Sequence, residues 1–270
     1  TSGVVYNAKV FKEAGVTELP KTPEEFQAAL KKIKENTKAI PLYTNFAEAW
    51  AMGAWDAYIG GNATGDPKFM NQVMPHDKTP FKKDDKAPDT HPYAVYKTLY
   101  DAVANGYTEE DYSTTDWESS KGRINNGEIA TMVLGAWAVP QMKQAGDHPD
   151  DVQYMPFPIT VDGKQYATLA GNYSMGINKN SDKDRQEAAM IFVKWMTEKS
   201  GYAKNEGGIP IVKSDDSLPE TYEHFKDVDL IVDDPAKEGE EDLFADINSD
   251  SELGINNGNC KKIHDIVTDA

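Results

Sequence analysis

Aromatic side chains stand beside an amide and a carboxylate where a predicted strand passes into a predicted helix. Trp50 begins such a helix after the strand predicted for residues 39–44. Its neighbours in the sequence include Tyr43, Asn45 and Glu48. Aromatic rings pack against the apolar C–H faces of sugars, while polar side chains bond to the hydroxyl groups around the rim. These four residues are therefore candidates for binding a neutral, hydroxyl-rich ligand.

A second junction of the same kind lies near the middle of the chain. Residues 129–134 form a buried strand candidate, Gly135 bends the chain, and Trp137 begins a short predicted helix. Ligands of α/β folds bind in the crevice at the carboxyl ends of the strands. Trp137 is therefore a candidate for the same site, with a position in the core as the alternative. Trp117, at another predicted helix start, is left open between the cleft and packing.

Charge and cysteine content limit the classes of partner. The chain of 270 residues carries 45 acidic and 28 basic residues, a net charge of −17. Nucleic acids and anionic membranes are therefore excluded, because phosphate contacts need clustered Lys and Arg. The acidity favours a neutral or cationic ligand, or is a surface property alone. With Cys260 as the single cysteine, no disulfide within the chain and no cysteine-based zinc site is expected. We predict no cofactor and no metal.

Periodicity predicts an α/β chain in which helices dominate. Helices are expected at residues 22–36, 47–59, 91–105, 116–126, 137–145, 182–198, 200–205, 220–226, 240–247 and 257–267. Strands are expected at residues 39–44, 129–134, 152–157 and 170–177, and a long surface excursion at 62–90. The helix at 182–198 carries an apolar stripe, which predicts a buried core face of Ala188, Ile191, Phe192 and Trp195.

Two further patterns suggest other chemistry. Glycosidases need two carboxylates at the scissile bond, and Asp111, Asp116 and Glu118 offer such pairs, although pairs are common in so acidic a chain. The run 246–250 has the spacing of the first three ligands of a calcium loop, but Ser251 stands where that loop needs glycine, which favours a plain acidic turn. A glycoside-active enzyme and a surface carbohydrate-binding or adhesion module remain the alternatives to a solute-binding protein.

Several segments resemble, in order, the type 1 extracellular solute-binding proteins, which include maltodextrin-binding proteins. The matching segments are GVVYNAKVFKEAG at 3–15, TPEEF at 22–26, NGEIATM at 126–132 with GAW at 135–137, PFP at 156–158, GNYSMGI at 171–177, the 188–195 helix and GGIP at 207–210. The resemblance covers nearly the whole chain and is specific for the family, not for one sugar.

The resemblance implies a fold of the type II periplasmic-binding-protein class, with a helix-rich second lobe and part of a first lobe. By this analogy residues 1–157 form the second lobe, 158–198 cross to the first lobe, and 199–270 return. A first-lobe segment that the family carries before residue 1 is expected to be missing. The implied function is delivery of an oligosaccharide to an ABC permease. The implied location is outside the cell, either at the cell surface as a lipoprotein or in the periplasm, with any membrane attachment only through a lipid anchor outside this chain. The resemblance adds Asn172 and Tyr173, on the crossing segment, to the site.

Overall fold

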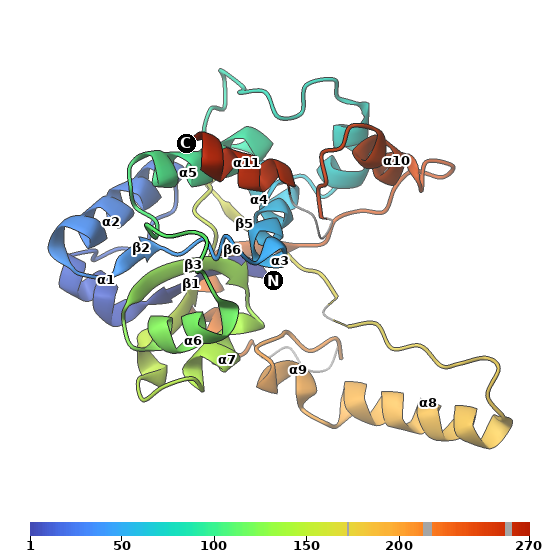
Figure 1. Cartoon of the computed structure of the whole chain (residues 1–270). Coiled ribbons are helices and arrows are strands. Elements are labelled where there is room, and N and C mark those ends of the chain that lie inside the picture. The colour runs from blue at the N-terminus through green and yellow to red at the C-terminus, as the bar shows by residue number, and fades with distance from the viewer. Residues whose placement is uncertain (172, 213–217, 257–260) are drawn as a thin grey trace.

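A four-stranded mixed sheet forms the centre of the computed structural model, which describes residues 1–171, 173–212, 218–256 and 261–270 (Figure 1). The strands are β1 Ser2–Asn7, β2 Ile40–Leu42, β3 Ile129–Gly135 and β4 Val152–Met155, in the order β2-β3-β1-β4. β1 runs antiparallel to both of its neighbours, whereas β2 and β3 are parallel. The predictions of β2, β3 and β4 are confirmed, but our sequence analysis assigns no strand to residues 2–7.

Helices cover both faces of this sheet, so successive residues of β1 enter different cores. Val4 and Tyr6 pack with helices on one face, and Val5 packs with helices on the other. The first face carries α1 Ala8–Ala14, α2 Pro23–Asn36, α5 His91–Ala104 and α11 Lys261–Asp269. The second carries α6 Trp117–Asn125, α7 Ala138–Lys143 and the 3-10 helix Glu220–Phe225. Burial on both faces explains why β1 and β3 are apolar without alternation.

The helix predicted at residues 22–36 is confirmed as α2, and its start follows from its sequence. The Thr22 hydroxyl accepts a hydrogen bond from the Glu25 backbone N–H at 3.2 Å, and Pro23 occupies the first helical position. Phe26 and Leu30 lie on the buried face. α6 begins in the same way, because Asp116 accepts from the Ser119 N–H at 2.7 Å. Both caps fix the position of the helix start.

The prediction of one helix over residues 47–59 is wrong. The segment forms α3 Ala49–Met52, the 3-10 helix Gly53–Tyr58 and then α4 Gly61–Thr64. Trp55 and Tyr58 are each 1% exposed, and the Tyr58 hydroxyl donates to the Gly3 carbonyl and accepts from the Gly3 N–H. Tertiary contacts with β1 therefore set the tighter winding of this segment, next to a glycine of low helix propensity.

A second, two-stranded parallel sheet consists of β5 Gln165–Thr168 and β6 Val228–Ile231. It is joined to α4 by the buried Asn62, whose amide oxygen accepts from the Thr168 N–H at 3.0 Å and whose amide nitrogen donates to the Tyr166 carbonyl at 3.0 Å. The strand predicted for residues 170–177 is wrong for the described part of that segment, which forms no strand. Its described residues are exposed or half-buried and pair with no neighbouring strand, so its glycine-rich apolar pattern has no sheet to join.

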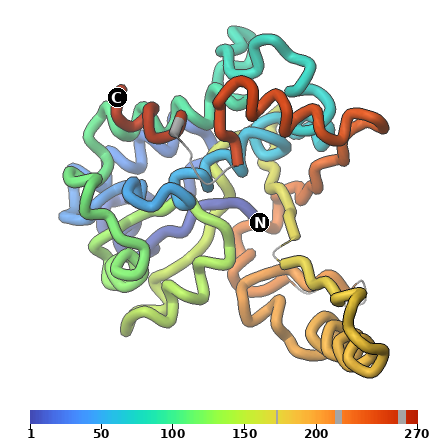
Figure 2. The backbone as a smooth tube through the Cα atoms, turned by 45° about the vertical axis from the view of Figure 1, so that its right-hand side comes forward, coloured from blue at the N-terminus to red at the C-terminus, as the bar shows by residue number. Residues whose placement is uncertain are grey.

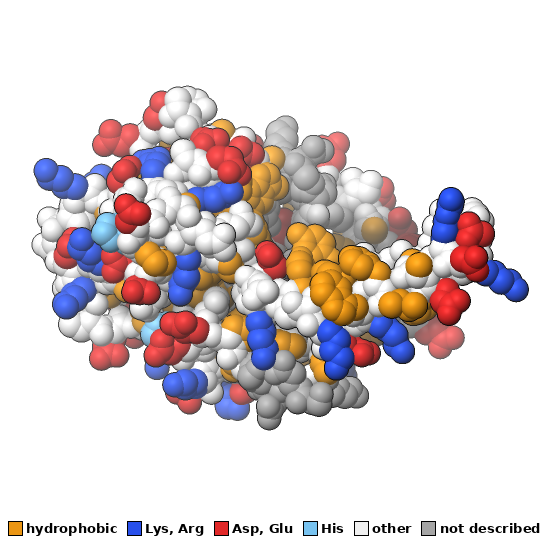
Figure 3. All heavy atoms as spheres, turned by 90° about the horizontal axis from the view of Figure 1, so that it is seen from below, with side chains coloured by type: hydrophobic (Ala, Val, Ile, Leu, Met, Phe, Trp, Pro, Cys, Tyr) orange, Lys and Arg blue, Asp and Glu red, His pale blue; other side chains and the backbone are white. Residues whose placement is uncertain are grey.

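The helix predicted at residues 182–198 is confirmed as α8 Lys183–Glu198, but its burial is not. α8 lies at the end of an arm that projects from the body of the protein (Figures 1 and 2). No residue of α8 is buried; Ile191, Phe192 and Trp195 are 63%, 56% and 52% exposed. Figure 3 shows hydrophobic side chains gathered along this arm. The prediction of a buried stripe is therefore wrong for this chain, because the described residues offer no element against which the stripe packs.

Most of the remaining elements lie at the surface. The surface excursion predicted for residues 62–90 is confirmed from residue 75 on, whereas Phe69, Met70 and Met74 in the π-helix Phe69–Val73 and the 3-10 helix Met74–His76 are buried. α9 Tyr202–Asn205 and α10 Leu243–Asp250 follow in the acidic half of the chain. The acidic run at 246–250 lies inside α10 and forms a helix rather than a turn. Among the described residues, no helix is long and apolar enough to cross a membrane, and no three metal-binding side chains gather in one place.

Candidate functional site

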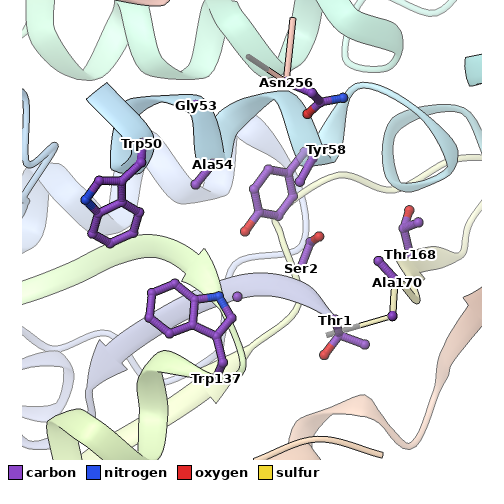
Figure 4. Close-up of a pocket in the computed structure, with 13 residues that line it drawn as sticks. Thr1, Ser2, Trp50, Gly53, Ala54, Tyr58, Trp137, Thr168, Ala170 and Asn256 are labelled. Atoms are coloured by element: carbon purple, nitrogen blue, oxygen red, sulfur yellow. The ribbon is translucent and has the colours of Figure 1, made fainter. Parts of the chain in front are cut away.

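A cavity of about 460 Å³ opens at the end of the central sheet (Figure 4). The start of β1, the end of β3, the segment from α3 to Tyr58 and the chain that leaves β5 form its walls. Its lining is apolar or neutral: Thr1, Ser2, Trp50, Gly53, Ala54, Ala57, Tyr58, Gly135, Trp137, Thr168, Ala170, Gly171 and Asn256. None of the side chains of these described residues is acidic or basic, so the side-chain lining suits a neutral ligand better than an ion.

Three tryptophans from three different elements meet beside this cavity. The ring centroids lie 5.8 Å apart for Trp50 and Trp137, 5.2 Å for Trp50 and Trp117, and 5.5 Å for Trp117 and Trp137. Trp50 and Trp137 line the cavity, and Trp50 remains 39% exposed. Trp117 supports them from the side and has the Lys121 ammonium 5.0 Å from its ring centroid. The cluster presents two indole rings to a ligand and holds them in place with the third.

Local sequence sets the position of Trp137. β3 ends at Gly135, and a Cβ atom there would lie 2.7 Å from two atoms of the Trp137 indole. Only glycine lets the indole rest against the strand end at this distance. Ala136 is buried in the core behind it, so the chain turns directly from the sheet into α7. The Gly-Ala-Trp sequence therefore directs an aromatic ring toward the cavity.

Three other predicted site residues lie close to Trp50 in the sequence but do not line the cavity. Tyr43 is 3% exposed, its hydroxyl accepts from the Asp116 N–H at 3.1 Å, and burial raises the pKa of its phenol. Asn45 is 1% exposed and has a positive φ of 57°. Glu48 is half-buried and precedes α3. These residues shape the loop that carries Trp50 instead of facing the cavity.

The two predictions on the crossing segment have different outcomes. Asn172 lies outside the described residues. Tyr173 is 72% exposed, and its ring centroid lies 6.0 Å from that of Tyr202 in α9. Its neighbours Ala170 and Gly171 line the cavity, whereas Tyr173 does not. In this structure Tyr173 therefore belongs to the arm and not to the cavity wall.

Sequence analysis missed several residues of the cavity wall. Thr168 ends β5, a strand that the sequence analysis does not predict, and Asn256 lies in an acidic, irregular part of the chain. Tyr58 lies in the helix predicted at residues 47–59 and is not named there as a site residue, yet its ring reaches the cavity as well as β1 (Figure 4). The turn dipeptide Asn257–Gly258 follows Asn256 in the sequence, but it gives no sign that Asn256 reaches a site.

The comparison with known proteins settles the family. Residues 1–203 match the family described as bacterial extracellular solute-binding protein. The chain belongs to this family. The chain shares with its structural neighbours the helix-rich α/β fold of the type II periplasmic binding proteins.

This solute-binding protein resembles two solved structures from Bifidobacterium animalis subsp. lactis. It is 92% identical to a manno-oligosaccharide-specific solute-binding protein in complex with mannotriose, with a TM-score of 0.96, covering 100% of this chain and 63% of that one. It is 81% identical to an ABC-transporter binding protein in complex with mannobiose, with a TM-score of 0.96, covering 99% of this chain and 63% of that one. A diacetylchitobiose-binding protein of Streptomyces coelicolor is 55% identical over 40 residues, 15% of this chain and 9% of that protein.

The carboxylates that could form a glycosidase pair by sequence have other partners in this solute-binding protein. Hydrogen bonds from Ser113 lower the pKa of Asp111, and those from Ser119 lower the pKa of Asp116. Glu118 is 77% exposed and pairs with Lys121. A general acid requires a raised pKa and a place beside the scissile bond. None of the three carboxylates lines the cavity.

Proposed function

We propose that this protein binds a manno-oligosaccharide and delivers it to the permease of an ABC importer. The observation that carries the proposal is the neutral cavity with two indole rings in its wall. Such rings cover the C–H face of a pyranose, and Ser2, Thr168 and Asn256 offer polar groups for its hydroxyls. The choice of mannose follows from the relatives that hold mannotriose and mannobiose.

The proposal includes a second lobe, because sugar contacts within this chain are few. Two rings that each cover about 100 Å² contribute about 5 kcal/mol at about 25 cal/mol/Å², before association costs. That corresponds to binding of about millimolar strength or weaker. We therefore propose that residues 1–157 form most of one lobe, that residues 158–198 cross to a first lobe, and that 199–270 return. Closure of two lobes on the sugar adds the remaining contacts.

The exposed apolar stripe of α8 supports this division. A helix in water does not present Ile191, Phe192 and Trp195 together without a partner surface. We propose that the stripe packs within the first lobe. The rest of that lobe corresponds to the 37% of the relative's length that this chain does not match. The protein then acts outside the cytoplasm as a binder without catalytic activity, attached to the membrane through a lipid anchor. The neutral cavity wall supports binding over hydrolysis.

Saturation-transfer NMR tests the function directly. The chain is mixed with mannobiose or mannotriose at millimolar concentration. Chitobiose and raffinose serve as comparison sugars of other stereochemistry. We expect transfer to the manno-oligosaccharides and weaker transfer to the others. Equal transfer to all sugars would refute the proposed specificity for mannose. Transfer to no sugar would refute the proposal that the cavity of this chain binds sugar.

A further inference from the structure

A buried carboxylate lies directly behind the cavity wall. Asp56 belongs to the 3-10 helix Gly53–Tyr58, between the lining residues Ala54 and Ala57, yet it is only 3% exposed. One of its oxygens accepts from the Tyr96 hydroxyl of α5 at 2.8 Å. The other accepts from the backbone N–H of Asn256 at 2.8 Å. Its two bonds thus join the cavity wall to a helix and to a segment 200 residues further along the chain.

The segment that Asp56 holds is fixed from a second side. The Asn248 side chain donates to the Ile255 carbonyl and accepts from the Ile255 N–H, both at 2.9 Å, and Ile255 is 6% exposed. Asn256 then turns with a φ of 56° and lies at the cavity edge above Tyr58 (Figure 4). The Asn256 N–H is therefore held by the buried Asp56, and the preceding residue is held by the half-buried Asn248, while Asn256 itself is exposed.

We propose that Asn256 determines specificity in the sugar site and that Asp56 is the positioning residue that holds it there. An amide both donates and accepts hydrogen bonds, as a sugar hydroxyl does, so an amide on a backbone held in place distinguishes hydroxyl configurations. A carboxylate suits the positioning role, because a bond from an N–H to a charged oxygen is about twice as strong as a neutral one. This inference rests on the proposed function and extends it to residues that no sequence pattern indicates.

The first test removes the amide and leaves the backbone unchanged. Asn256→Gly keeps the N–H that bonds to Asp56, and glycine adopts positive φ without strain. We expect the dissociation constant for mannotriose, from titration of the indole N–H signals, to rise about three- to tenfold, as for the loss of one hydrogen bond. The thermal unfolding midpoint should not fall. Equal affinity of the variant and the wild type would overturn the inference.

The second test separates positioning from stability. Asp56→Ala should weaken mannotriose binding by a similar factor, and Asp56→Asn, whose amide oxygen still accepts from the Asn256 N–H, should restore it. In an Asn256→Gly background Asp56→Ala should weaken binding no further, because both changes act on the same amide. Tyr96→Phe is the control: it removes the other bond to Asp56 and should lower the unfolding midpoint without changing affinity.

The outcomes distinguish this inference from the function on which it rests. A wild-type chain that binds no oligosaccharide overturns both. A wild-type chain that binds mannotriose, with an additive effect of Asp56→Ala and Asn256→Gly, leaves the function and overturns the positioning role. If Asp56→Ala does not fold, the comparison of Asn256→Gly with the wild type still decides whether the amide contacts the sugar.

Discussion

Replacement of Trp137 by alanine gives the sharpest test of the aromatic wall. The indole lies at the cavity edge, 5.8 Å from the ring of Trp50, so one pyranose can touch both rings. Loss of about 100 Å² of contact at about 25 cal/mol/Å² removes about 2.5 kcal/mol of binding free energy. This corresponds to about a 70-fold rise in the dissociation constant for mannotriose. A site of millimolar strength then gives no measurable saturation transfer.

The control for this experiment is Trp195→Ala, which removes an indole that is 52% exposed on α8, away from the cavity. We expect it to leave the sugar signal unchanged. Because Trp137 also packs on Trp50 and Trp117, the circular dichroism of the Trp137→Ala variant must match that of the wild type. A change in affinity of less than about threefold, about 0.7 kcal/mol, in a folded Trp137→Ala variant would refute the stacking argument.

Three further predictions concern Gly135, Glu109 and Phe192. Gly135→Ala should displace the Trp137 indole, which would lie 2.7 Å from the new Cβ, and reduce sugar transfer in NMR while the fold persists; unchanged transfer contradicts this. Burial raises the pKa of the Glu109 carboxyl group above its usual 4.5, so this group's contribution to the free energy of unfolding is lost as the pH rises through the raised value. Glu109→Gln should therefore flatten the decline of that free energy with pH, measured by urea unfolding. An identical pH dependence in the variant and the wild type argues against this prediction. Phe192→Ser should change the free energy of unfolding by no more than about 0.5 kcal/mol, because the side chain is 56% exposed; a larger loss in a denaturant titration means that α8 is packed.

Elements with local start signals could be predicted from the sequence, and elements that depend on distant partners could not. α2 and α6 begin at a threonine and an aspartate whose side chains cap them, so the residues themselves specify the start. β1 carries no such signal, since its apolar run becomes a strand only between β3 and β4. The segment at 170–177 has a similar pattern but no partner, and it forms no strand in its described part. Pairing, not propensity, separates these two cases.

The same reasoning applies to the site. Trp50 and Trp137 could be found because each follows a strand end, and that place faces the crevice in an α/β fold. Tyr43 is also aromatic and also follows a strand end, but it is buried in the core, where its hydroxyl accepts from the Asp116 N–H. Asn256 reaches the cavity through a bond to a residue 200 positions away, which no local pattern records. Side-chain direction and long-range contact therefore limit prediction of the site.

The place of β1 in the sheet has a consequence for how the chain folds. This strand precedes both of its partner strands in the sequence and occupies an inner position, with Ser2 opposite Gly135 and Asn7 opposite Val152. During synthesis it must therefore wait, apolar on both faces, until both partner strands have emerged. Closure of loops of this length is slow, because their entropy is lost before any pairing compensates for it. The sheet therefore completes late, and the time that β1 spends unpaired sets the period in which the nascent chain is most prone to aggregate.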